Sequence, residues 1–300
     1  MRAVVLREVG GDLAVEDAPA PEGADVVDVR AAGVNFLDVL IRRGRYPQMP
    51  ELPHILGSEV AGDLDGKRVM ALPRASGGGY AERVAVDPRW TVELPEGASY
   101  AEGASFLMTF LTAFVPLMRL ARPTHDSTVL VHAGSGGVGV ASIQLAKFAG
   151  ATVIATASTN EKRAFARKQG ADDVRGYDEI DDVRADVVID PVGGEVFTRS
   201  LKLLNPLGSI VAIGFAGGAW QPVDPALVVG RNVSVVGFYL GRLMALRPDY
   251  VRECVDELVA LWRRGVLRPV VGATFPLEQA ADAHRLIEER QHVGKVVLVP

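Results

Sequence analysis

The chain has 300 residues and a formal net charge of -5 at pH 7. This length exceeds the usual size of one hydrophobic core, so we expect two compact units. Hydrophobic residues make up 48% of the chain and charged residues 23%, which is the composition of a globular protein. A net negative charge disfavours binding to nucleic acid, so we expect no nucleic-acid partner.

The cysteine content and the length of the apolar runs indicate where in the cell the protein is found. A single cysteine, Cys254, excludes an intramolecular disulfide and any zinc site built from several cysteines. The first residues lack the charged start and apolar block of a signal peptide, and we find no run of roughly 18 apolar residues that would span a bilayer. We therefore expect a soluble, cytoplasmic protein without a membrane partner.

The first 90 residues or so carry short β-like runs separated by glycine and proline turns. These runs occupy residues 1–6, 26–29 and 67–72. They predict an antiparallel or barrel-like domain, in which Asp65 and Gly66 form a tight hairpin turn. Ser99 and Glu102 have the spacing of a capping box, whose hydroxyl and carboxylate accept from free backbone N–H groups. A helix should begin there and continue to about Leu120.

From residue 127 the pattern changes to apolar runs that alternate with helical stretches. The runs occupy residues 128–131, 153–156, 186–189, 209–213 and 233–236. Strands covered by helices on both faces have no polar side, which produces such continuous runs. The pattern predicts a doubly wound parallel sheet. An amphipathic stretch around residues 251–262 follows, and a strand-like run at residues 294–299 ends the chain.

A glycine-rich turn lies between the first of these runs and a helix-forming stretch at residues 140–148. It reads G-x-G-x-x-G and comprises Gly134, Ser135, Gly136, Gly137, Val138 and Gly139. In this context the glycines let the turn close and let the backbone approach a pyrophosphate, while the helix N-terminus attracts the phosphate charge. The motif predicts a dinucleotide site; the alternative is a purely structural glycine turn.

The residues after the second run indicate which dinucleotide binds. In a site for NAD, an acidic residue at the end of the second strand would bind the ribose 2′-hydroxyl, and none stands here. Ser158, Lys162 and Arg163 can instead supply a hydrogen bond and positive charge to a 2′-phosphate. We therefore predict NADPH. The alternative for Lys162 and Arg163 is a solvated charge on a helix face, and Arg163 fits that alternative better.

Short motifs in a fixed order extend over nearly the whole chain. They stand at residues 32–38, 43–47, 56–62, 79–82, 111–114, 134–139, 190–194 and 292–296. In these motifs the sequence resembles the medium-chain dehydrogenase/reductase superfamily, and within it the zinc-independent quinone oxidoreductases. The resemblance implies an α/β fold: a GroES-like β-rich catalytic domain, residues 1–114 and 264–300, and an inserted Rossmann NADPH-binding domain with a doubly wound parallel sheet, residues 115–263. It also implies an active site in the cleft between them.

The zinc alcohol dehydrogenases of the same superfamily have a cysteine ligand where Asn35 stands and a histidine ligand where Ser58 stands. Zn²⁺ needs three or four nitrogen, sulfur or carboxylate donors, so we predict that no metal is bound. The five histidines show no metal-ligand spacing, and we expect each to be a surface or cofactor-adjacent residue. They are His54, His125, His132, His284 and His292.

Without a metal to polarise a carbonyl, reduction is easiest for a conjugated acceptor, so the resemblance implies hydride transfer to a quinone or another conjugated carbonyl compound. It places Asn35, Tyr46 and Thr112 around the nicotinamide and the substrate. Asn35 and Thr112 offer hydrogen bonds, and Tyr46 is the candidate proton donor. The alternatives are a turn-forming side chain for Asn35 and a packing residue in a proline turn for Tyr46.

The resemblance also implies cofactor and subunit contacts. Lys162 and Tyr177 match the family's contacts to the 2′-phosphate, although Tyr177 is alternatively an ordinary loop aromatic. Gly214, Phe238 and Lys295 stand where the family's chain passes the cofactor; Phe238 is alternatively a core or interface residue. Residues 233–237 resemble the edge strand through which the family pairs its subunits, so we expect a homodimer.

Two departures from the family leave the acceptor open. Leu40 stands where the family often has a tyrosine, which makes the expected substrate wall more apolar, and the connection between Gly62 and Lys67 is much shorter than in relatives. The same motifs also permit reduction of 2-alkenals or enoyl thioesters. A non-enzymatic alternative is an NADPH-binding sensor or structural protein with little turnover.

Overall fold

The computed structural model describes residues 1–74 and 77–300, and it divides into two compact units. Unit 1 comprises Met1–Met108 and Arg268–Pro300, and unit 2 comprises Thr109–Leu267. The sequence predicts these divisions after residue 114 and before residue 264, and the structure has them after Met108 and before Arg268. The end of the chain returns to the first unit, which is the split arrangement that the resemblance implies.

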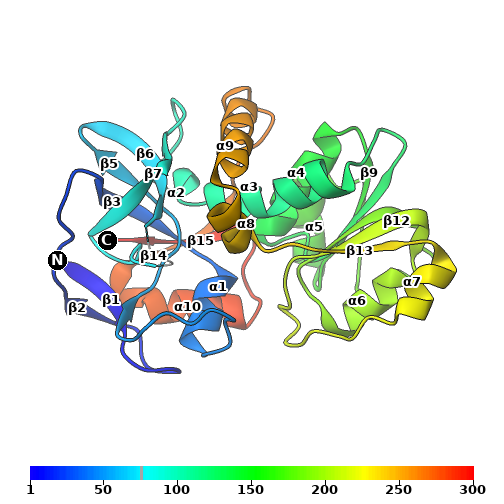
Figure 1. The fold of residues 1–300 in the computed structure, drawn as a ribbon, viewed down its shortest axis with the longest axis horizontal. Helices are drawn as coiled ribbons and strands as arrows, with labels where there is room; N and C mark the ends of the chain where they lie inside the picture. Colours follow the sequence, from blue (N-terminus) through cyan, green and yellow to red (C-terminus); the bar gives the residue numbers. More distant parts are fainter. Residues whose placement is uncertain (75–76) are drawn as a thin grey trace. The chain divides into compact units, whose positions relative to one another are not determined.

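Unit 1 is built on β-strands (Figure 1). A three-stranded sheet has the order β2-β1-β4, and a six-stranded sheet has the order β14-β15-β3-β5-β6-β7 with a further β3–β7 pairing. The strands are β1 (Arg2–Leu6), β2 (Ala14–Asp17), β3 (Val26–Val34), β4 (His54–Ile55), β5 (Val60–Leu64), β6 (Lys67–Pro73), β7 (Arg83–Glu93), β14 (Val271–Pro276) and β15 (Lys295–Val299). Since β7 pairs with both β6 and β3, four of these strands close on themselves. The predicted barrel-like domain is confirmed.

The hairpin between β5 and β6 forms as its sequence predicts. Leu64 pairs with Lys67 across the turn, and the two residues between them, Asp65 and Gly66, have φ angles of 49° and 76°. Two consecutive positive φ angles are the geometry of a tight turn whose twist matches that of the strands, and Asp-Gly is among the pairs that tolerate it. The short connection therefore holds no further element.

The expected helix after Ser99 is interrupted. Its capping box is present, because the Ser99 amide donates to Glu102 Oε2 at 2.7 Å and the Glu102 amide donates to Ser99 Oγ at 3.2 Å. The helix α2 (Tyr100–Gly103) ends after one turn, and α3 (Leu107–Phe114) gives way to a π-helical segment, η1 (Val115–Ala121). Pro116 lies at the start of that segment, and its ring nitrogen cannot donate the bond that would continue an α-helix. A single α-helix to Leu120 was therefore a wrong prediction.

The same stretch corrects the expectation of no membrane-length apolar run. In the part of the chain that the structure describes, Tyr100–Ala121 is the one helical run long and apolar enough, by length and composition, to cross a membrane. An 18-residue window within it has a mean hydropathy of 1.6, and 67% of that window is buried inside the protein. Such burial is the property of a core helix.

The other helices of unit 1 pack on its strands. They are α1 (Phe36–Arg42), the short 3-10 helix η2 (Leu277–Gln279) and α10 (Ala280–Glu288). Ala280, Ala283 and Ile287 of α10 are buried in one core with Val4 and Leu298 of the sheets. Apolar residues three or four apart on a helix lie on one face, which is why this segment forms an amphipathic helix.

Unit 2 contains a six-stranded parallel sheet of order β10-β9-β8-β11-β12-β13. The strands are β8 (Thr128–Val131), β9 (Thr152–Thr156), β10 (Asp173–Arg175), β11 (Ala185–Asp190), β12 (Leu204–Ala212) and β13 (Ser234–Gly237). Counted from β8, this is the order 3-2-1-4-5-6 of the doubly wound dinucleotide-binding fold. The predicted Rossmann sheet is confirmed, and β10 is a strand that the sequence did not predict.

Helices cover both faces of this sheet, and Figure 1 shows α4 and α6 on its opposite sides. The helices are α4 (Gly137–Phe148), α5 (Asn160–Lys168), α6 (Gly194–Leu201), α7 (Pro225–Arg231), α8 (Leu240–Leu246) and α9 (Pro248–Arg263). Phe197 and Leu201 of α6 share a core with Leu130, Val188 and Ile210 of the strands. Coverage of both faces explains the continuous apolar runs of these strands.

Candidate functional site

The predicted cofactor residues of unit 2 gather at one edge of its sheet. Because all six strands are parallel, their carboxyl ends lie on the same edge, which is where ligands bind in open α/β sheets. Each of these residues follows a strand end: Gly134 follows β8, Ser158 follows β9, Tyr177 follows β10, Gly214 follows β12 and Phe238 follows β13. The topology thus brings together residues that are spread over about a hundred positions of the sequence.

The glycine turn has the close packing that a phosphate site needs. The Gly134 amide donates to the Thr156 carbonyl at 2.9 Å, which ties the turn to β9. A Cβ atom on Gly134 would lie 2.8 Å from the Cβ of Ala155, and one on Gly139 would lie 2.2 Å from the Ala133 carbonyl oxygen. Only glycine fits at either position. The first N–H groups of α4 have no carbonyl acceptor within the helix, so they are free to bind an anion. Because the glycines carry no side chains, a pyrophosphate can approach this backbone closely.

The pairing of β9 with β10 sets Ser158 and Tyr177 at the same level. Thr156 is the register partner of Arg175, and the Ala157 amide donates to the Arg175 carbonyl at 3.0 Å. Ser158 and Tyr177 each follow these paired residues by two positions. Lys162 lies in the first turn of α5, where its amide donates to the Oγ1 of the N-cap residue Thr159 at 3.3 Å. Hydroxyl, phenol and ammonium groups thus follow adjacent strand ends, and no carboxylate ends β9.

Arg163 has a structural partner instead. Its Nη1 lies 3.1 Å from Glu179 Oε2, and its Nε donates to the Ala157 carbonyl at 3.3 Å. The guanidinium therefore joins α5 to the end of β9 and to the loop after β10. This ion pair supports the alternative in which Arg163 has no part in phosphate binding.

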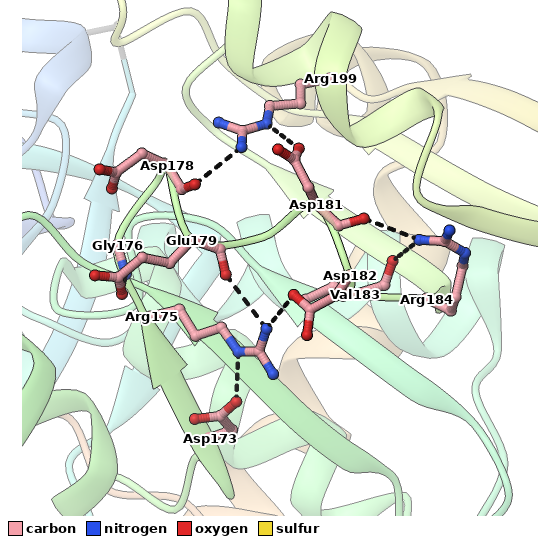
Figure 2. Close-up of polar contacts among 10 residues, drawn as sticks. All are labelled: Asp173, Arg175, Gly176, Asp178, Glu179, Asp181, Asp182, Val183, Arg184 and Arg199. Atoms are coloured by element: carbon pink, nitrogen blue, oxygen red, sulfur yellow. Dashed lines mark hydrogen bonds and ion pairs between the residues drawn. The ribbon is translucent and has the colours of Figure 1, made fainter.

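Guanidinium groups hold the loop that carries Tyr177 (Figure 2). Arg199 of α6 donates to the Tyr177 carbonyl at 2.8 Å, to the Asp178 carbonyl at 3.0 Å and to Asp181 Oδ1 at 2.6 Å. This ion pair lowers the pKa of the Asp181 carboxyl. On the strand side, Arg175 donates to the Glu179 carbonyl at 3.3 Å. The backbone of Tyr177 is therefore fixed by a side chain that sequence analysis did not single out.

A buried histidine lies beside Tyr177. The rings of His132 and Tyr177 are stacked, with centroids 5.9 Å apart and planes inclined by 22°. His132 Nδ1 lies 2.9 Å from Thr156 Oγ1, and its Nε2 lies 2.6 Å from Ser200 Oγ. The Ser200 hydroxyl donates its proton to the Val196 carbonyl, so it accepts from Nε2–H, and Nδ1 accepts from Thr156. The hydrogen bonds thus fix one neutral tautomer.

His284 corrects the expectation that every histidine is a surface or cofactor-adjacent residue, whereas His132 is buried beside Tyr177, one of the predicted cofactor residues. Both are fully buried, and burial lowers the pKa of each to about 3. For His132 the sequence held a usable signal, because the residue continues the apolar run of β8. His284 stands four residues after Ala280 and three before Ile287, so it lies on the buried face of α10, but its partner Tyr80 stands 204 positions earlier and has no local signal.

Asp190 is a further residue at the carboxyl edge to which sequence analysis gave no role. It ends β11, and its Oδ1 accepts from the amides of Val192 at 2.7 Å and Gly193 at 3.0 Å. Burial raises the pKa of this carboxyl. The side chain fixes the turn between β11 and α6, in which Gly193 has a φ of 70°.

Unit 1 holds a buried polar cluster around Asn35. Lys295 Nζ lies 2.7 Å from Glu59 Oε1, 2.6 Å from Asn35 Oδ1 and 3.1 Å from the Val34 carbonyl. Asn35 Nδ2 donates to Ser58 Oγ and to Glu59 Oε1, both at 3.0 Å. An ammonium group has three N–H donors, and all three of Lys295 are used here. A cofactor contact by this residue, as the resemblance implies, would have to involve another part of it.

A second buried group supports the backbone of Asn35. The Asn35 amide donates to Asp38 Oδ2 at 2.8 Å, which caps α1, and the same oxygen accepts from the Tyr80 hydroxyl at 3.1 Å. The Tyr80 oxygen also lies 3.3 Å from His284 Nε2. Burial raises the pKa of Asp38 to about 6 and holds the pKa of the Tyr80 phenol well above its ordinary value.

The three predicted catalytic residues do not share a unit. Asn35 and Tyr46 belong to unit 1, where Tyr46 is half-buried and packs against the core. Thr112 lies on α3 and belongs to unit 2. Leu40, which was expected in a substrate wall, is 8% exposed on α1.

The residues at the zinc-ligand positions of the zinc dehydrogenases bond to each other. Asn35 donates to Ser58, and neither has a thiol, imidazole or carboxylate. Over residues 1–74 and 77–300, no group of three or more histidine, cysteine or acidic side chains is placed to hold a metal ion.

Comparisons with known proteins cover the whole chain. A family model described as alcohol dehydrogenase GroES-like domain matches residues 21–96, and one described as zinc-binding dehydrogenase matches residues 163–298. The quinone oxidoreductase of Rattus norvegicus is 31% identical over 327 residues, which covers 100% of this chain and 98% of the relative. The synaptic vesicle membrane protein VAT-1 homolog of the same species is 33% identical over 345 residues, covering 100% and 84%. A quinone oxidoreductase from Thermus thermophilus, also solved in complex with NADPH, has a TM-score of 0.90 at 37% identity and covers 100% of both chains.

Proposed function

This chain belongs to the quinone oxidoreductase family of the medium-chain dehydrogenase/reductase superfamily, and we propose that it is an NADPH-dependent, zinc-independent reductase of quinones or other conjugated carbonyl compounds. The observation that carries the proposal is the carboxyl edge of the parallel sheet. At this edge, the glycine turn has no room for a Cβ atom at Gly134 or Gly139, and the adjacent strand β9 ends without an acidic residue. Ser158, Lys162 and Tyr177 follow the ends of β9 and β10 at the same edge.

The residues of unit 2 bind the cofactor in this proposal. The amides at the start of α4 bind the pyrophosphate, and Ser158, Lys162 and Tyr177 bind the 2′-phosphate. The chain at Gly214 and Phe238 lines the path of the dinucleotide. When bound, NADPH supplies a hydride from C4 of its nicotinamide ring. The absence of an acid at the end of β9 favours NADPH over NADH, because a carboxylate there would repel the 2′-phosphate.

A second set of side chains acts on the acceptor in this proposal. Thr112 offers a hydrogen bond, and Tyr46 supplies the proton to the reduced product. The side-chain amide of Asn35 is already bonded to Ser58, Glu59 and Lys295, so it holds those side chains in place. A conjugated carbonyl needs less external polarisation than an isolated one, so this set can work without a metal. In the proposal, reductase activity is retained after treatment with a strong chelator, and loss of activity on metal removal contradicts it.

Subunit pairing is a separate part of the proposal. The strand β13 (Ser234–Gly237) ends the sheet of unit 2, pairs on one side with β12, and leaves a row of backbone groups on the other. Such an edge is a template for another strand. We infer a cytoplasmic homodimer that pairs through β13, and light scattering of the purified chain tests its mass.

An acceptor screen tests the reaction. NADPH absorbance is followed with 1,2-quinones, 1,4-quinones, 2-alkenals and a crotonyl thioester under the same conditions. The proposal predicts the highest kcat/KM with a quinone. A preference for the alkenal or the thioester would transfer the chain to that reductase class. Binding of NADPH without oxidation by any acceptor would identify a binding protein instead.

A further inference from the structure

The polar cluster of unit 1 has one hydrogen-bond donor left over. Lys295 uses its three N–H groups on Val34, Asn35 and Glu59. A lysine ammonium cannot accept, so the oxygen of the Asn35 side-chain amide must be the atom that faces it. The orientation of that amide is thereby fixed, and its NH₂ group must face Ser58 and Glu59.

The two N–H groups of the Asn35 amide are then also used. They donate to Ser58 Oγ and Glu59 Oε1, each at 3.0 Å. Asn35 therefore has no donor to offer a substrate. A reduced acceptor carries negative charge on oxygen and needs a donor, so Asn35 cannot bind that oxygen as it lies.

Ser58 is the residue that can. The Ser58 Oγ accepts a hydrogen bond from the Asn35 amide, so the Ser58 hydroxyl hydrogen must point in another direction. Among the described residues, this hydrogen has no acceptor. The donors of the neighbouring residues Asn35 and Lys295 are already used, and Ser58 is 7% exposed, so it is largely shielded from bulk water. A shielded donor is worth more to a developing charge than one in water.

We propose that the Ser58 hydroxyl donates the hydrogen bond that binds the acceptor's carbonyl oxygen and stabilises the negative charge that develops there. The inference rests on the proposed function. Two electrons and one proton pass as hydride from NADPH, which is oxidised to NADP⁺, to the conjugated acceptor, whose oxygen becomes an oxyanion. That oxygen then takes one proton, for which Tyr46 is the candidate donor. Ser58 keeps its own proton throughout.

The test uses the full chain and the probe 4-nitrophenol, whose phenolate resembles a reduced quinone and absorbs at a different wavelength from the phenol. Its pKa when bound is measured without NADPH in the wild type, in Ser58→Ala, in Ser58→Thr and in Ser105→Ala. Ser105 is a matched control, because it is a fully buried serine of unit 1 whose hydroxyl already donates to the Ala101 carbonyl at 2.7 Å.

We expect Ser58→Ala to raise the pKa of the bound phenol by about one unit, since a hydrogen bond to a charged acceptor is lost. Ser58→Thr, which keeps a hydroxyl, should restore the wild-type value, and Ser105→Ala should not change it. With NADPH and the best acceptor, Ser58→Ala should lower kcat/KM by about 10- to 100-fold.

Three results would overturn the inference. One is a bound-phenol pKa that is equal in the wild type and Ser58→Ala. Another is failure of the wild type to bind 4-nitrophenol at millimolar concentration. The third is a Ser58→Ala variant that loses NADPH affinity and keeps phenol affinity, which would assign the hydroxyl to the cofactor. The phenol titration needs no turnover, so it decides the role of Ser58 even if the acceptor screen finds no reductase activity.

Discussion

The ammonium group of Lys295 lies 2.7 Å from Oε1 of Glu59, and the two side chains are 6% and 1% exposed. The residues stand 236 positions apart, so the pair joins the last strand of the chain to the segment that precedes β5. Removing two charges from water costs free energy that only close pairing and further hydrogen bonds offset. Here Asn35, Val34 and Met108 supply those bonds, and Asn35 is held in place as a result.

Breaking this pair should destabilise the fold more than breaking a surface pair. Lys295→Met or Glu59→Leu leaves one buried charge without its charged partner, so each should lower the free energy of unfolding by about 3–5 kcal/mol. The double variant Lys295→Met/Glu59→Leu should lose less stability than the sum of the losses in the two single variants. Lys147→Met is the control, because Lys147 pairs with Asp172 at 37% and 43% exposure and should change stability by less than about 1 kcal/mol. Urea unfolding measures all four; equal effects of Lys147→Met and Lys295→Met would contradict the analysis.

Asp38 should make stability depend on pH in a defined direction. Its pKa is about 6 in the folded chain, against an ordinary value of 3.8. Between these values the unfolded chain releases the proton while the folded chain keeps it. The contribution to stability is therefore complete below about pH 4 and is lost as the pH rises to about 6, by an amount on the order of 3 kcal/mol.

Asp38→Asn tests that dependence, because the amide oxygen can still accept from Asn35 and carries no charge. Urea unfolding of both proteins at pH 4, 5, 6 and 7 should show the wild type losing stability relative to the variant across this range. Parallel pH profiles would contradict a raised pKa for this carboxyl.

Gly139→Ala should weaken NADPH binding by at least about tenfold. The added methyl group would lie 2.2 Å from the Ala133 carbonyl oxygen, so the turn that presents the α4 amides must shift. Gly230→Ala is the matched control, since a Cβ there meets no atom within 4 Å and the residue lies in helix α7. Fluorescence titration measures both dissociation constants. An unchanged affinity in Gly139→Ala would show that the turn does not bind the cofactor.

Arg199→Met should lower the preference for NADPH over NADH. Arg199 holds the Tyr177 carbonyl, so its loss frees the loop that carries the proposed 2′-phosphate contact. We expect NADPH affinity to fall by about three- to tenfold, with little change for NADH, which lacks that phosphate. Arg184→Met is the control, because Arg184 donates to the carbonyls of Asp181 and Val183 in the same loop without touching Tyr177. Equal losses for both cofactors would indicate a merely structural role.

Local signals predicted the parts of the fold that local chemistry determines. The capping box at Ser99, the Asp65-Gly66 turn and the glycine turn each depend on residues within a few positions of one another, and all three formed. Continuous apolar runs predicted the buried parallel strands, because such a run is also a pattern of neighbouring residues. The strand β10 was missed because its three residues are too few to show a pattern.

Contacts between distant residues could not be predicted in this way. The bonds from Arg199 to the Tyr177 loop span 22 positions, and the Asn35–Ser58 and Lys295–Glu59 contacts span 23 and 236. Only the folded chain shows that these polar groups satisfy each other's hydrogen-bonding capacity. The change from α3 to the π-helical segment η1 occurs at Pro116, which is visible in the sequence. Whether a proline ends a helix or changes its form depends on the surrounding helix, so the sequence alone did not predict the π-helix.

The central claim is that the chain reduces a conjugated carbonyl compound with NADPH in preference to NADH. Its most direct test is kcat/KM for the two dinucleotides with the best quinone of the acceptor screen. We predict a value at least about tenfold higher for NADPH, since charge-assisted bonds to the 2′-phosphate are lost with NADH. Equal values for the two, a preference for NADH, or no oxidation of either would contradict the proposal.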